Sequence, residues 1–334
     1  MLYLNRDDVG KLLSFELCIE ACEEVLKLQA QGQAEEMPRF KFLREPLPEG
    51  TIMPGLPPGS PAFMIAYLRP YGITTLRTLS PSPMLILWDE QSELMMIDAQ
   101  TLRDRRTGAV AAIASKYLAR SDSHKFGVIG SGNQASASLA AHSTLFEISE
   151  CKVFSPTEEH RDAFVRRFKG EGIDIVGVDS AQKAVDGADI VIGGSGVTGP
   201  NRPPVLLGEW LSPGMHVSSI AGRAELDDEV VRRADRVVVD AKKTFPEESW
   251  DITRQVEKGI TTWDEIDALE DVVGGVRPGR QGPDEVTLLK TVGTAAQDTL
   301  PAFRLYQIAQ EKGVGRDLGA LFPRLTPVWP QAAH

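Results

Sequence analysis

The sequence predicts an α/β protein, with a doubly wound (Rossmann) parallel sheet in one domain and an α+β unit in another. From residue 125 onward, short apolar strand-like segments alternate with helical ones, which is typical of a parallel sheet. Residues 63–98 instead read as strands joined by turns, which is typical of an antiparallel sheet. A chain of 334 residues has room for two domains of about 150 residues each.

The composition is that of an ordinary globular protein with an acidic surface. Hydrophobic residues make up 42 % and charged residues 25 % of the chain, the net charge is −11, and the pI is near 5.1. Such a charge argues against nucleic acid and anionic membranes as partners. No apolar run of about 18 residues could span a bilayer, and the N-terminus lacks a signal-peptide pattern. We expect a soluble cytoplasmic enzyme.

The three cysteines and five histidines do not form a metal-binding pattern. Cys18 and Cys22 lie one helical turn apart with no histidine near them in the sequence, so we expect two buried thiols on one helix face. Three cysteines are too few for a disulfide framework, which agrees with a reducing compartment. We therefore expect no metal.

The N-terminal part combines helices with the antiparallel strands. Apolar residues at three- and four-residue steps predict one amphipathic helix over residues 7–31. A Pro- and Gly-rich stretch follows, and an alanine-rich helix over 104–120, with Asp104 or Thr101 as its N-cap, closes this part. Between them we expect an antiparallel meander of four strands: residues 63–68, 75–79, 84–89 and 93–98.

The second part begins after a short polar bridge at residues 121–124. The predicted strands are residues 125–129, 151–154, 173–178, 188–192, 216–220 and 236–239. The predicted helices between them include residues 135–145, 160–170 and 181–185. A C-terminal helix is predicted to start over 286–293, to be interrupted at Pro301 and to resume over 302–311.

The segment KFGVIGSGNQA, residues 125–135, has the strand–turn–helix context of a dinucleotide-binding fingerprint. Gly130 permits the tight turn, and Gly132 has no Cβ, so the backbone can approach a pyrophosphate. Ala135 is small enough for the following helix to pack on the strand. The helix N-terminus adds free N–H groups and a partial positive charge.

Ligands of a parallel sheet bind beyond the carboxyl ends of its strands, which extends the predicted cofactor site to other loops. The residues expected to line it from these loops are Gly130, Ser131, Gly132, Asn133, Gln134, Ser155, Thr157, Arg161, Gly194 and Ser195.

The end of the second strand bears on the choice between NAD and NADP. An NAD site favours Asp or Glu there, to accept a hydrogen bond from the ribose 2′-hydroxyl. This chain has Ser155 and Thr157, with Arg161 one helical turn on, which fit a 2′-phosphate better. Glu158 and Glu159 argue the other way, so NADP is the preferred expectation and NAD the alternative.

Two arginines could hold a carboxylate bidentately, namely Arg106 before the fingerprint and Arg39 near the chain start. Taken alone, each is equally consistent with a surface arginine, and Arg106 with a local ion pair to Asp104.

Five longer pieces, in their order, resemble the ornithine cyclodeaminase/mu-crystallin family of NAD(P)-dependent enzymes. They are RTGAVAAIASKYLA (106–119), FGVIGSGNQA (126–135), ADIVIGGS (188–195), AGRAELDDEVVRRADRVVVD (221–240) and GRQGPDEVTLLKTVGTAAQD (279–298). The resemblance extends from the N-terminal helix to about residue 312.

The resemblance implies roles for the residues at matching positions. The arginine of the family's RTGA motif contacts the substrate carboxylate, and Arg106 occupies that position, with Thr107 beside it at the cofactor. The family's P-x-R arginine also faces the substrate, and Arg39 is the nearest match. The segment matching KTVG starts at Lys290 and lies near the nicotinamide. It adds Thr291, Val292 and Gly293 to the site.

The family builds one domain from both chain ends, and this domain binds substrate and mediates dimerisation. We therefore predict a substrate-binding and dimerisation domain from residues 1–120 and 300–334, and a dinucleotide-binding domain from residues 121–299. A homodimer is expected, because the strands of residues 63–98 have edges that need covering.

Two departures from the family pattern concern the chemistry. The strand of residues 63–69 lacks the family's lysine, for which Arg69 is the substitute at hand. Ser219 stands where cyclodeaminases carry an aspartate, and a serine hydroxyl is no base at neutral pH without help. A serine there resembles the mu-crystallin branch, whose activity is imine reduction.

The sequence leads to an NAD(P)-dependent oxidoreductase that reduces an imine (ketimine) of a small amino acid, or runs the reverse dehydrogenation. Arg106 and Arg39 would hold the carboxylate, and the proton would come from Ser219, Tyr67 or a bound water. One alternative is an ornithine cyclodeaminase-type ammonia lyase that uses bound NAD. Another is a non-catalytic NADPH-binding protein.

Overall fold

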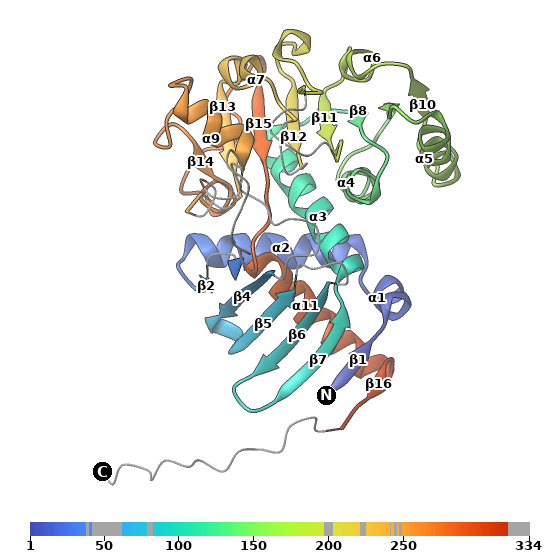
Figure 1. Cartoon of the computed structure of the whole chain (residues 1–334), viewed down its shortest axis with the longest axis vertical. Coiled ribbons are helices and arrows are strands. Elements are labelled where there is room, and N and C mark those ends of the chain that lie inside the picture. The colour runs from blue at the N-terminus through green and yellow to red at the C-terminus, as the bar shows by residue number, and fades with distance from the viewer. Residues whose placement is uncertain are drawn as a thin grey trace, which may run out of the picture.

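The computed structural model shows two sheet-based halves, one above the other in Figure 1, with helices between them. It describes residues 1–37, 40–41, 62–78, 83–196, 203–220, 225–240, 242–243, 246 and 249–319. None of the helices in these ranges is long and apolar enough to cross a membrane.

The first sheet contains strands from both ends of the chain. Its order is β16-β1-β7-β6-β5-β4-β2, with β3 also paired to β4. The strands are β1 (Leu2–Leu4), β2 (Ala34–Glu36), β3 (Phe40–Lys41), β4 (Ala62–Leu68), β5 (Ile73–Thr78), β6 (Met84–Asp89), β7 (Glu93–Asp98) and β16 (Arg316–Asp317). The predicted meander is confirmed, because β4 to β7 pair antiparallel in sequence order. The parallel β1–β7 pair makes the sheet mixed.

Residues on the two faces of this sheet differ in burial. On the inner face, Met64, Ile73 and Leu85 are buried and share a core with the helices, whereas the side chains of the outer face are partly exposed. The helices of this half are α1 (Arg6–Leu12), α2 (Phe15–Ala30), α3 (Gln100–Leu118) and α11 (Ala296–Lys312), with a short 3-10 helix, η1 (Arg69–Tyr71). Cys18 and Cys22 are both free and buried in α2, as predicted.

The single helix predicted over residues 7–31 was wrong, because the chain breaks it between α1 and α2. Leu13 leaves the helical conformation with an extended backbone, and Ser14 then caps α2 by accepting from the Leu17 backbone N–H. A serine side chain that caps a new helix competes with continuation of the old one.

Helix α3 begins earlier than predicted, so neither Thr101 nor Asp104 is its N-cap. The Asp98 side chain, at the end of β7, accepts from the Gln100 backbone N–H instead. Arg106 therefore lies within the helix rather than at its start. Farther along α3, a Cβ on Gly108 would lie 2.4 Å from the Ala137 carbonyl oxygen, so only glycine allows this close helix contact.

The second sheet is parallel throughout the described residues, in the order β10-β9-β8-β11-β12-β15-β13-β14. Its strands are β8 (Lys125–Ile129), β9 (Glu150–Phe154), β10 (Ile175–Val178), β11 (Ile190–Gly193), β12 (His216–Ser219), β13 (Arg236–Val239), β14 (Asp267–Ala268) and β15 (Thr287–Lys290). The predicted doubly wound sheet is thus confirmed.

Helices cover both faces of this sheet and form two separate cores (Figure 1). One face packs against α3, α4 (Asn133–His142) and α5 (Glu158–Gly170), and the other against α6 (Ala181–Val185), α7 (Asp228–Arg233) and α9 (Trp250–Glu257). Helix α10 (Leu269–Val273) packs against α2 of the first half, and η2 (Gly208–Trp210) contacts α7. The division at residues 121 and 299 stays a prediction.

The helix predicted over residues 286–293 was also wrong, because Thr287–Lys290 is strand β15 between β12 and β13. All four residues are buried, so the strand shows no polar–apolar alternation that could have revealed it. Pro301 lies inside the continuous helix α11. Proline cannot donate to the Gln297 carbonyl, and the Cys22 thiol donates to that oxygen at 3.7 Å instead.

Candidate functional site

Five strands of the parallel sheet end at the same level. We call the edge formed by their carboxyl ends the functional edge. Ile129, Gly193, Ser219, Lys290 and Val239 are successive partners across five neighbouring strands. The loops that follow these residues therefore lie side by side, at the edge where parallel sheets bind ligands.

Gly130 makes the fingerprint turn possible. Its φ is +110°, a region that favours glycine, and a Cβ there would lie 2.2 Å from the Gly194 carbonyl oxygen. A Cβ on Gly194 would in turn lie 3.1 Å from the Ala135 side chain. These three small residues let β8, β11 and α4 approach closely, as the fingerprint predicts.

No contact within the described structure requires glycine at position 132. Gly132 is the exposed N-cap of α4, its φ is −79°, and a Cβ built there meets nothing within 4 Å. The space beside it is therefore open, next to the free N–H groups at the start of the helix. An open position before a helix N-terminus fits a pyrophosphate.

The predicted nucleotide residues after β9 lie together. The Ser131 hydroxyl donates to the Ser155 hydroxyl at 2.9 Å, which joins the fingerprint loop to the end of β9. Arg161 donates to the Ser155 carbonyl at 3.3 Å and its side chain packs over Gly177. Thr157 is exposed as the N-cap of α5. The arginine and the hydroxyls thus occupy the place of a ribose-binding acid.

Other predicted cofactor residues form hydrogen bonds within the candidate site, and Gln134 joins the fingerprint loop to α3. Gln134 donates to Asp104 at 2.5 Å, and Gln100 donates to the other oxygen of the same carboxylate at 2.7 Å. The Thr107 hydroxyl donates to the Arg103 carbonyl of its own helix. The Ser195 backbone N–H donates to Glu225 at 3.0 Å, which holds the loop after β11.

Arg106 is buried and forms an ion pair with Asp298 of α11, not with Asp104. Its Nε donates to Asp298 Oδ1 at 2.8 Å, and its Nη1 donates to Gln297 at 3.3 Å. Burial alone would lower the pKa of Arg106, but Asp298 and Asp240 raise it above its ordinary value. The guanidinium is therefore charged at any physiological pH.

Arg77 is a second buried arginine on the same carboxylate. Its Nε lies 2.7 Å from Asp298 Oδ2, and its Nη2 donates to the Met64 sulfur at 3.0 Å. Both guanidiniums meet Asp298 through Nε, one on each carboxylate oxygen. The inner face of β4 and β5 thus carries a cation near Arg106, although it is not the lysine that the family pattern suggests.

The turn after β15 is held by Asp240 at the end of β13. The backbone N–H groups of Val292 and Gly293 donate to Asp240 at 2.9 and 2.8 Å, and the Thr291 hydroxyl donates to it as well. Gly293 has a φ of +80°, and a Cβ there would lie 2.3 Å from Arg106 Nη1. The structure therefore brings the predicted carboxylate-binding arginine against the predicted nicotinamide segment.

The Glu36 carboxyl group lies next to residues 294 and 295, which directly follow this turn. Burial raises the pKa of Glu36 to about 7, and Glu270 and Asp240 add to the effect, while hydrogen bonds from the Thr294 side chain and the Ala295 backbone oppose it. The group therefore gains and loses its proton near neutral pH, within the range in which an enzyme would work.

Ser219 lies in a buried hydrogen-bonded chain rather than alone. Its hydroxyl accepts from Lys290 Nζ at 2.9 Å and donates to Glu225 at 2.5 Å. Lys290 Nζ also donates to Asp251 at 2.8 Å, and all four side chains are almost fully buried. Lys290 and Glu225 thus contact the serine directly, and Asp251 contacts Lys290 and the Glu225 backbone N–H.

The other predicted catalytic residues lie elsewhere or outside the described residues. Tyr67 lies between Ala66 and Leu68, which are buried on the inner face, so it points to the outer face of the first sheet, away from Arg106. Arg69 is 57 % exposed and donates to Glu35 at 2.6 Å. Arg39 lies outside the described residues, as do residues 221–224 of the matching segment.

Several polar side chains that build the candidate site were not predicted from the sequence. They are Glu36, Arg77, Asp104, Glu225, Asp240, Asp251, Lys290, Gln297 and Asp298. Arg77 left a signal, because it follows Ile73 and Thr75 at the two-residue step of an inner face, where a charge is unusual. Asp298 left one as well, as a charge among apolar residues of a helix.

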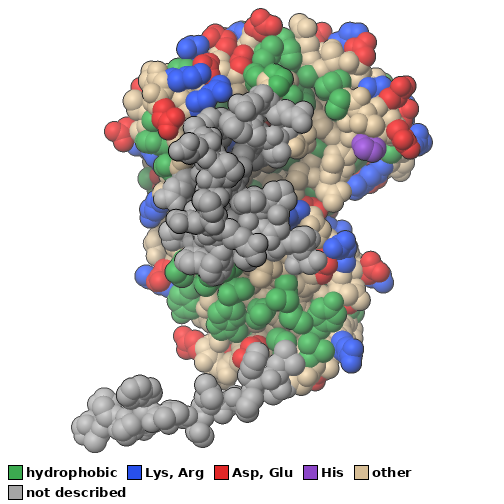
Figure 2. Space-filling model, viewed as in Figure 1, with side chains coloured by type: hydrophobic (Ala, Val, Ile, Leu, Met, Phe, Trp, Pro, Cys, Tyr) green, Lys and Arg blue, Asp and Glu red, His purple; other side chains and the backbone are tan. Residues whose placement is uncertain are grey.

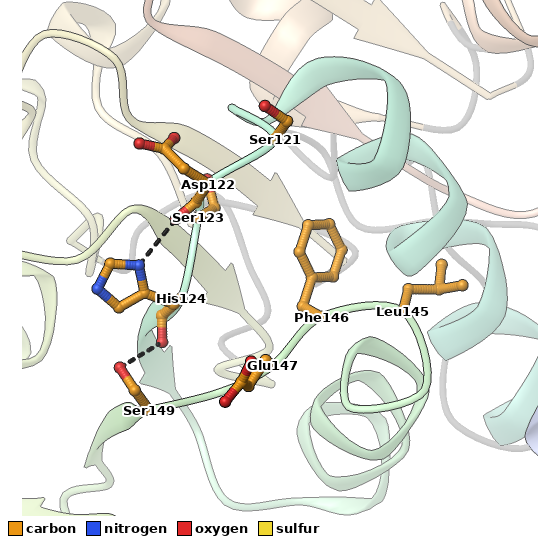
Figure 3. Close-up of a pocket in the computed structure, with 8 residues that line it drawn as sticks. All are labelled: Ser121, Asp122, Ser123, His124, Leu145, Phe146, Glu147 and Ser149. Carbon is orange, nitrogen blue, oxygen red and sulfur yellow. Dashed lines mark hydrogen bonds between the residues drawn. The ribbon is translucent and has the colours of Figure 1, made fainter.

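A cavity of about 500 Å³ lies at the opposite edge of the parallel sheet (Figure 3). It is lined by Ser121, Asp122, Ser123, His124, Leu145, Phe146, Glu147 and Ser149. These residues precede β8 and β9, so the cavity lies at amino ends of strands, away from the dinucleotide edge. The described residues also contain no group of three or more His, Cys, Asp or Glu side chains placed to hold a metal.

Comparison with known proteins identifies the family to which this chain belongs. The model of the ornithine cyclodeaminase/mu-crystallin family matches residues 1–313. The chain belongs to this family. The alanine dehydrogenase of Archaeoglobus fulgidus is 31 % identical over 325 residues, which cover 94 % of this chain and 97 % of that one.

Two solved structures of the family superpose over nearly the whole chain. The Δ1-pyrroline-2-carboxylate reductase of Thermococcus litoralis, in complex with NADH and L-proline, gives a TM-score of 0.85 at 31 % identity and covers 95 % of this chain and 100 % of that one. An archaeal alanine dehydrogenase dimer with bound NAD gives 0.83 at 30 % identity, covering 95 % and 98 %. The chain is thus a member of a family of NAD(P)-dependent oxidoreductases.

We expect Gly132→Val to weaken dinucleotide binding at least about tenfold, or ~1.4 kcal/mol, because the branched side chain fills the open space beside the helix N-terminus. Calorimetric titration with NADPH and NADH measures the effect. Gly10→Val is the matched control, since a Cβ at Gly10 in α1 also meets nothing within 4 Å. Unchanged affinity in Gly132→Val would show that the fingerprint does not bind the cofactor.

Proposed function

We propose that this protein is an NAD(P)-dependent oxidoreductase that reduces an imine of a small amino acid, or runs the reverse dehydrogenation. The observation that carries the proposal is the buried Arg106 guanidinium against Gly293, at the carboxyl edge of a Rossmann sheet. Relatives named for alanine dehydrogenation and pyrroline-2-carboxylate reduction act on substrates with a carboxylate next to the reacting carbon.

Arg106 is positioned to bind that carboxylate. Asp298 and Gln297 bind its Nε and Nη1, which fixes the plane of the guanidinium, and its Nη atoms face the Gly293 backbone. A fixed guanidinium binds a carboxylate through two parallel hydrogen bonds and so orients the carbon attached to it. The substrate's reacting carbon would then lie beside the turn that follows Lys290.

The dinucleotide fits the residues at the edge of the sheet. The open position at Gly132 and the N–H groups of α4 suit the pyrophosphate, and the turn held by Asp240 suits the nicotinamide end. When bound, the nicotinamide supplies or accepts the hydride. The protein's own contribution is to bind both reactants, orient them through Arg106, and provide a proton.

A spectrophotometric screen of the purified protein tests the reaction class. We expect oxidation of NADPH or NADH with cyclic imines, or with 2-oxo acids plus amines. Ammonia release from ornithine without net cofactor change would support the cyclodeaminase alternative instead. Tight NADPH binding without turnover on any of these compounds would support the non-catalytic alternative.

NADP is the cofactor that we propose, because Arg161 and two hydroxyl residues stand where an NAD site has an acid. We expect Arg161→Gln to weaken NADPH binding about tenfold, or ~1.4 kcal/mol, and to leave NADH binding nearly unchanged. Arg167→Gln on the same helix, where the arginine pairs with Glu171, is the control. A wild-type preference for NADH of tenfold or more would contradict the proposal.

A homodimer through the outer face of the first sheet is also proposed. Ile65, Leu76, Ile86 and Met96 are cross-strand partners on four adjacent strands of this face, and all are half-exposed. Figure 2 shows apolar side chains gathered over this region. Continuous apolar patches of this kind mark interaction sites, and the archaeal alanine dehydrogenase is a dimer.

We therefore expect Ile86→Glu to convert a dimer to a monomer, because it places a charge in the middle of the apolar row. Light scattering at micromolar concentration measures the mass. Val176→Glu, at an exposed position of the edge strand β10, is the control and stays dimeric. A wild-type protein that is monomeric would contradict the proposal.

Substitution of Arg106 tests the substrate role itself. We expect Arg106→Lys to lower kcat/KM by about 30-fold or more, because a point charge keeps the ion pair with Asp298 but lacks the bidentate fork. Arg106→Ala should cost up to several thousand-fold, about 5 kcal/mol, and also lower the melting temperature.

Cofactor affinity should change much less than turnover in both Arg106 variants. Arg105→Ala is the matched control, since Arg105 is the next residue but stacks on Phe15 instead. Near-wild-type kcat/KM in Arg106→Lys and Arg106→Ala would remove Arg106 from the substrate site.

A further inference from the structure

The buried chain around Ser219 has an arrangement that suits proton transfer. The Ser219 hydroxyl has one hydrogen, which it donates to Glu225, and it accepts from Lys290 on one of its two lone pairs. A hydroxyl between an ammonium and a carboxylate can pass a proton on and be supplied with another by the ammonium.

These hydrogen-bonded side chains lie at the carboxyl edge of the parallel sheet, next to the turn that contacts Arg106. Ser219 and Lys290 are register partners on neighbouring strands, and each ends its strand at the functional edge. The Ser219 carbonyl accepts from the Thr291 backbone N–H at 3.1 Å, so the serine adjoins the turn that contacts Arg106 through Gly293. Glu225 joins it to the Ser195 loop.

We propose that Ser219 donates the proton to the imine nitrogen and that Lys290 resupplies the serine. This step rests on the proposed function. The Ser219 O–H bond breaks as an N–H bond forms on the imine. A Lys290 N–H bond breaks as the serine O–H bond is restored. The imine becomes an iminium ion and the ammonium becomes an amine, so protons and charge balance.

The two carboxylates make this role possible for a buried lysine. Asp251 accepts from Lys290 Nζ at 2.8 Å, which fixes the direction of this amino group toward Ser219. Glu225 keeps the serine hydrogen oriented between turnovers. Ser219 stands where cyclodeaminases have an aspartate. Unlike an isolated hydroxyl, it has Lys290 and Glu225 beside it to supply and orient the proton.

The test compares an imine, which needs a proton, with an N-methylated analogue, which does not. One is Δ1-pyrroline-2-carboxylate, and the other is its N-methyl iminium analogue, which is already charged and cannot be protonated on nitrogen. Cofactor oxidation is measured for the wild type, Ser219→Ala and Lys290→Met. Ser218→Ala is the matched control, since Ser218 is the preceding buried serine of β12 and makes no side-chain hydrogen bond to the described residues.

We expect Ser219→Ala and Lys290→Met to lose about 10²-fold or more in kcat/KM on the imine, the usual contribution of a general acid. On the N-methyl iminium they should stay within a few-fold of the wild type. A role in holding loops would lower both activities equally, and that result, or no loss on either substrate, would overturn the proposal.

Ser219→Ala alone decides the question if Lys290→Met does not fold, because the alanine variant leaves every charge in place. A wild type that reduces neither compound, nor any other imine in the screen, would overturn the proposed function and the proton relay with it. A wild type that reduces the iminium and the imine with equal losses in the variants would overturn only the relay.

Discussion

The arrangement of the candidate site depends on the two ion pairs of Asp298. One of its oxygens accepts a hydrogen bond from Arg106 of α3, the other forms an ion pair with Arg77 of β5, and all three side chains are buried. Removing either arginine would take away one of the two buried cations that pair with Asp298. Breaking a buried ion pair in this way destabilises the folded protein. A single carboxylate thus fixes α3, β5 and the start of α11 relative to one another. Arg106 in turn contacts Gly293, in the turn that follows β15.

The second constraint is the common level at which the parallel strands end. Asp240, Lys290 and Ser219 are distant in sequence, yet each stands at or just after a strand end, and the register puts them in one row. The fingerprint turn at Gly130 and the Ser195 loop follow two other strands of the same row. Parallel pairing therefore collects both the cofactor turns and the buried charges without any local sequence motif joining them.

The fingerprint could be predicted because its determinants are local, in Gly130, Gly132 and Ala135. The meander could be predicted because its strands alternate. Strand β15 could not, since both of its faces are buried and Thr287–Lys290 carries no alternation. Asp298, Arg77 and Glu225 depend on contacts between elements far apart in the chain, which spacing does not reveal. The proposal that Arg106 binds a carboxylate came from the family resemblance. The alternative interpretation, a local ion pair with Asp104, was wrong, because Arg106 pairs with Asp298 of a distant helix.

The glycine contact between α3 and α4 has a consequence for how these two helices can move. Gly108 brings the α3 backbone against the Ala137 carbonyl, so the helix that carries Arg106 and the helix that follows the fingerprint turn are packed without intervening side chains. Because no side chain lies between the two backbones at this point, a displacement of α4 would be passed directly to α3, two residues from Arg106.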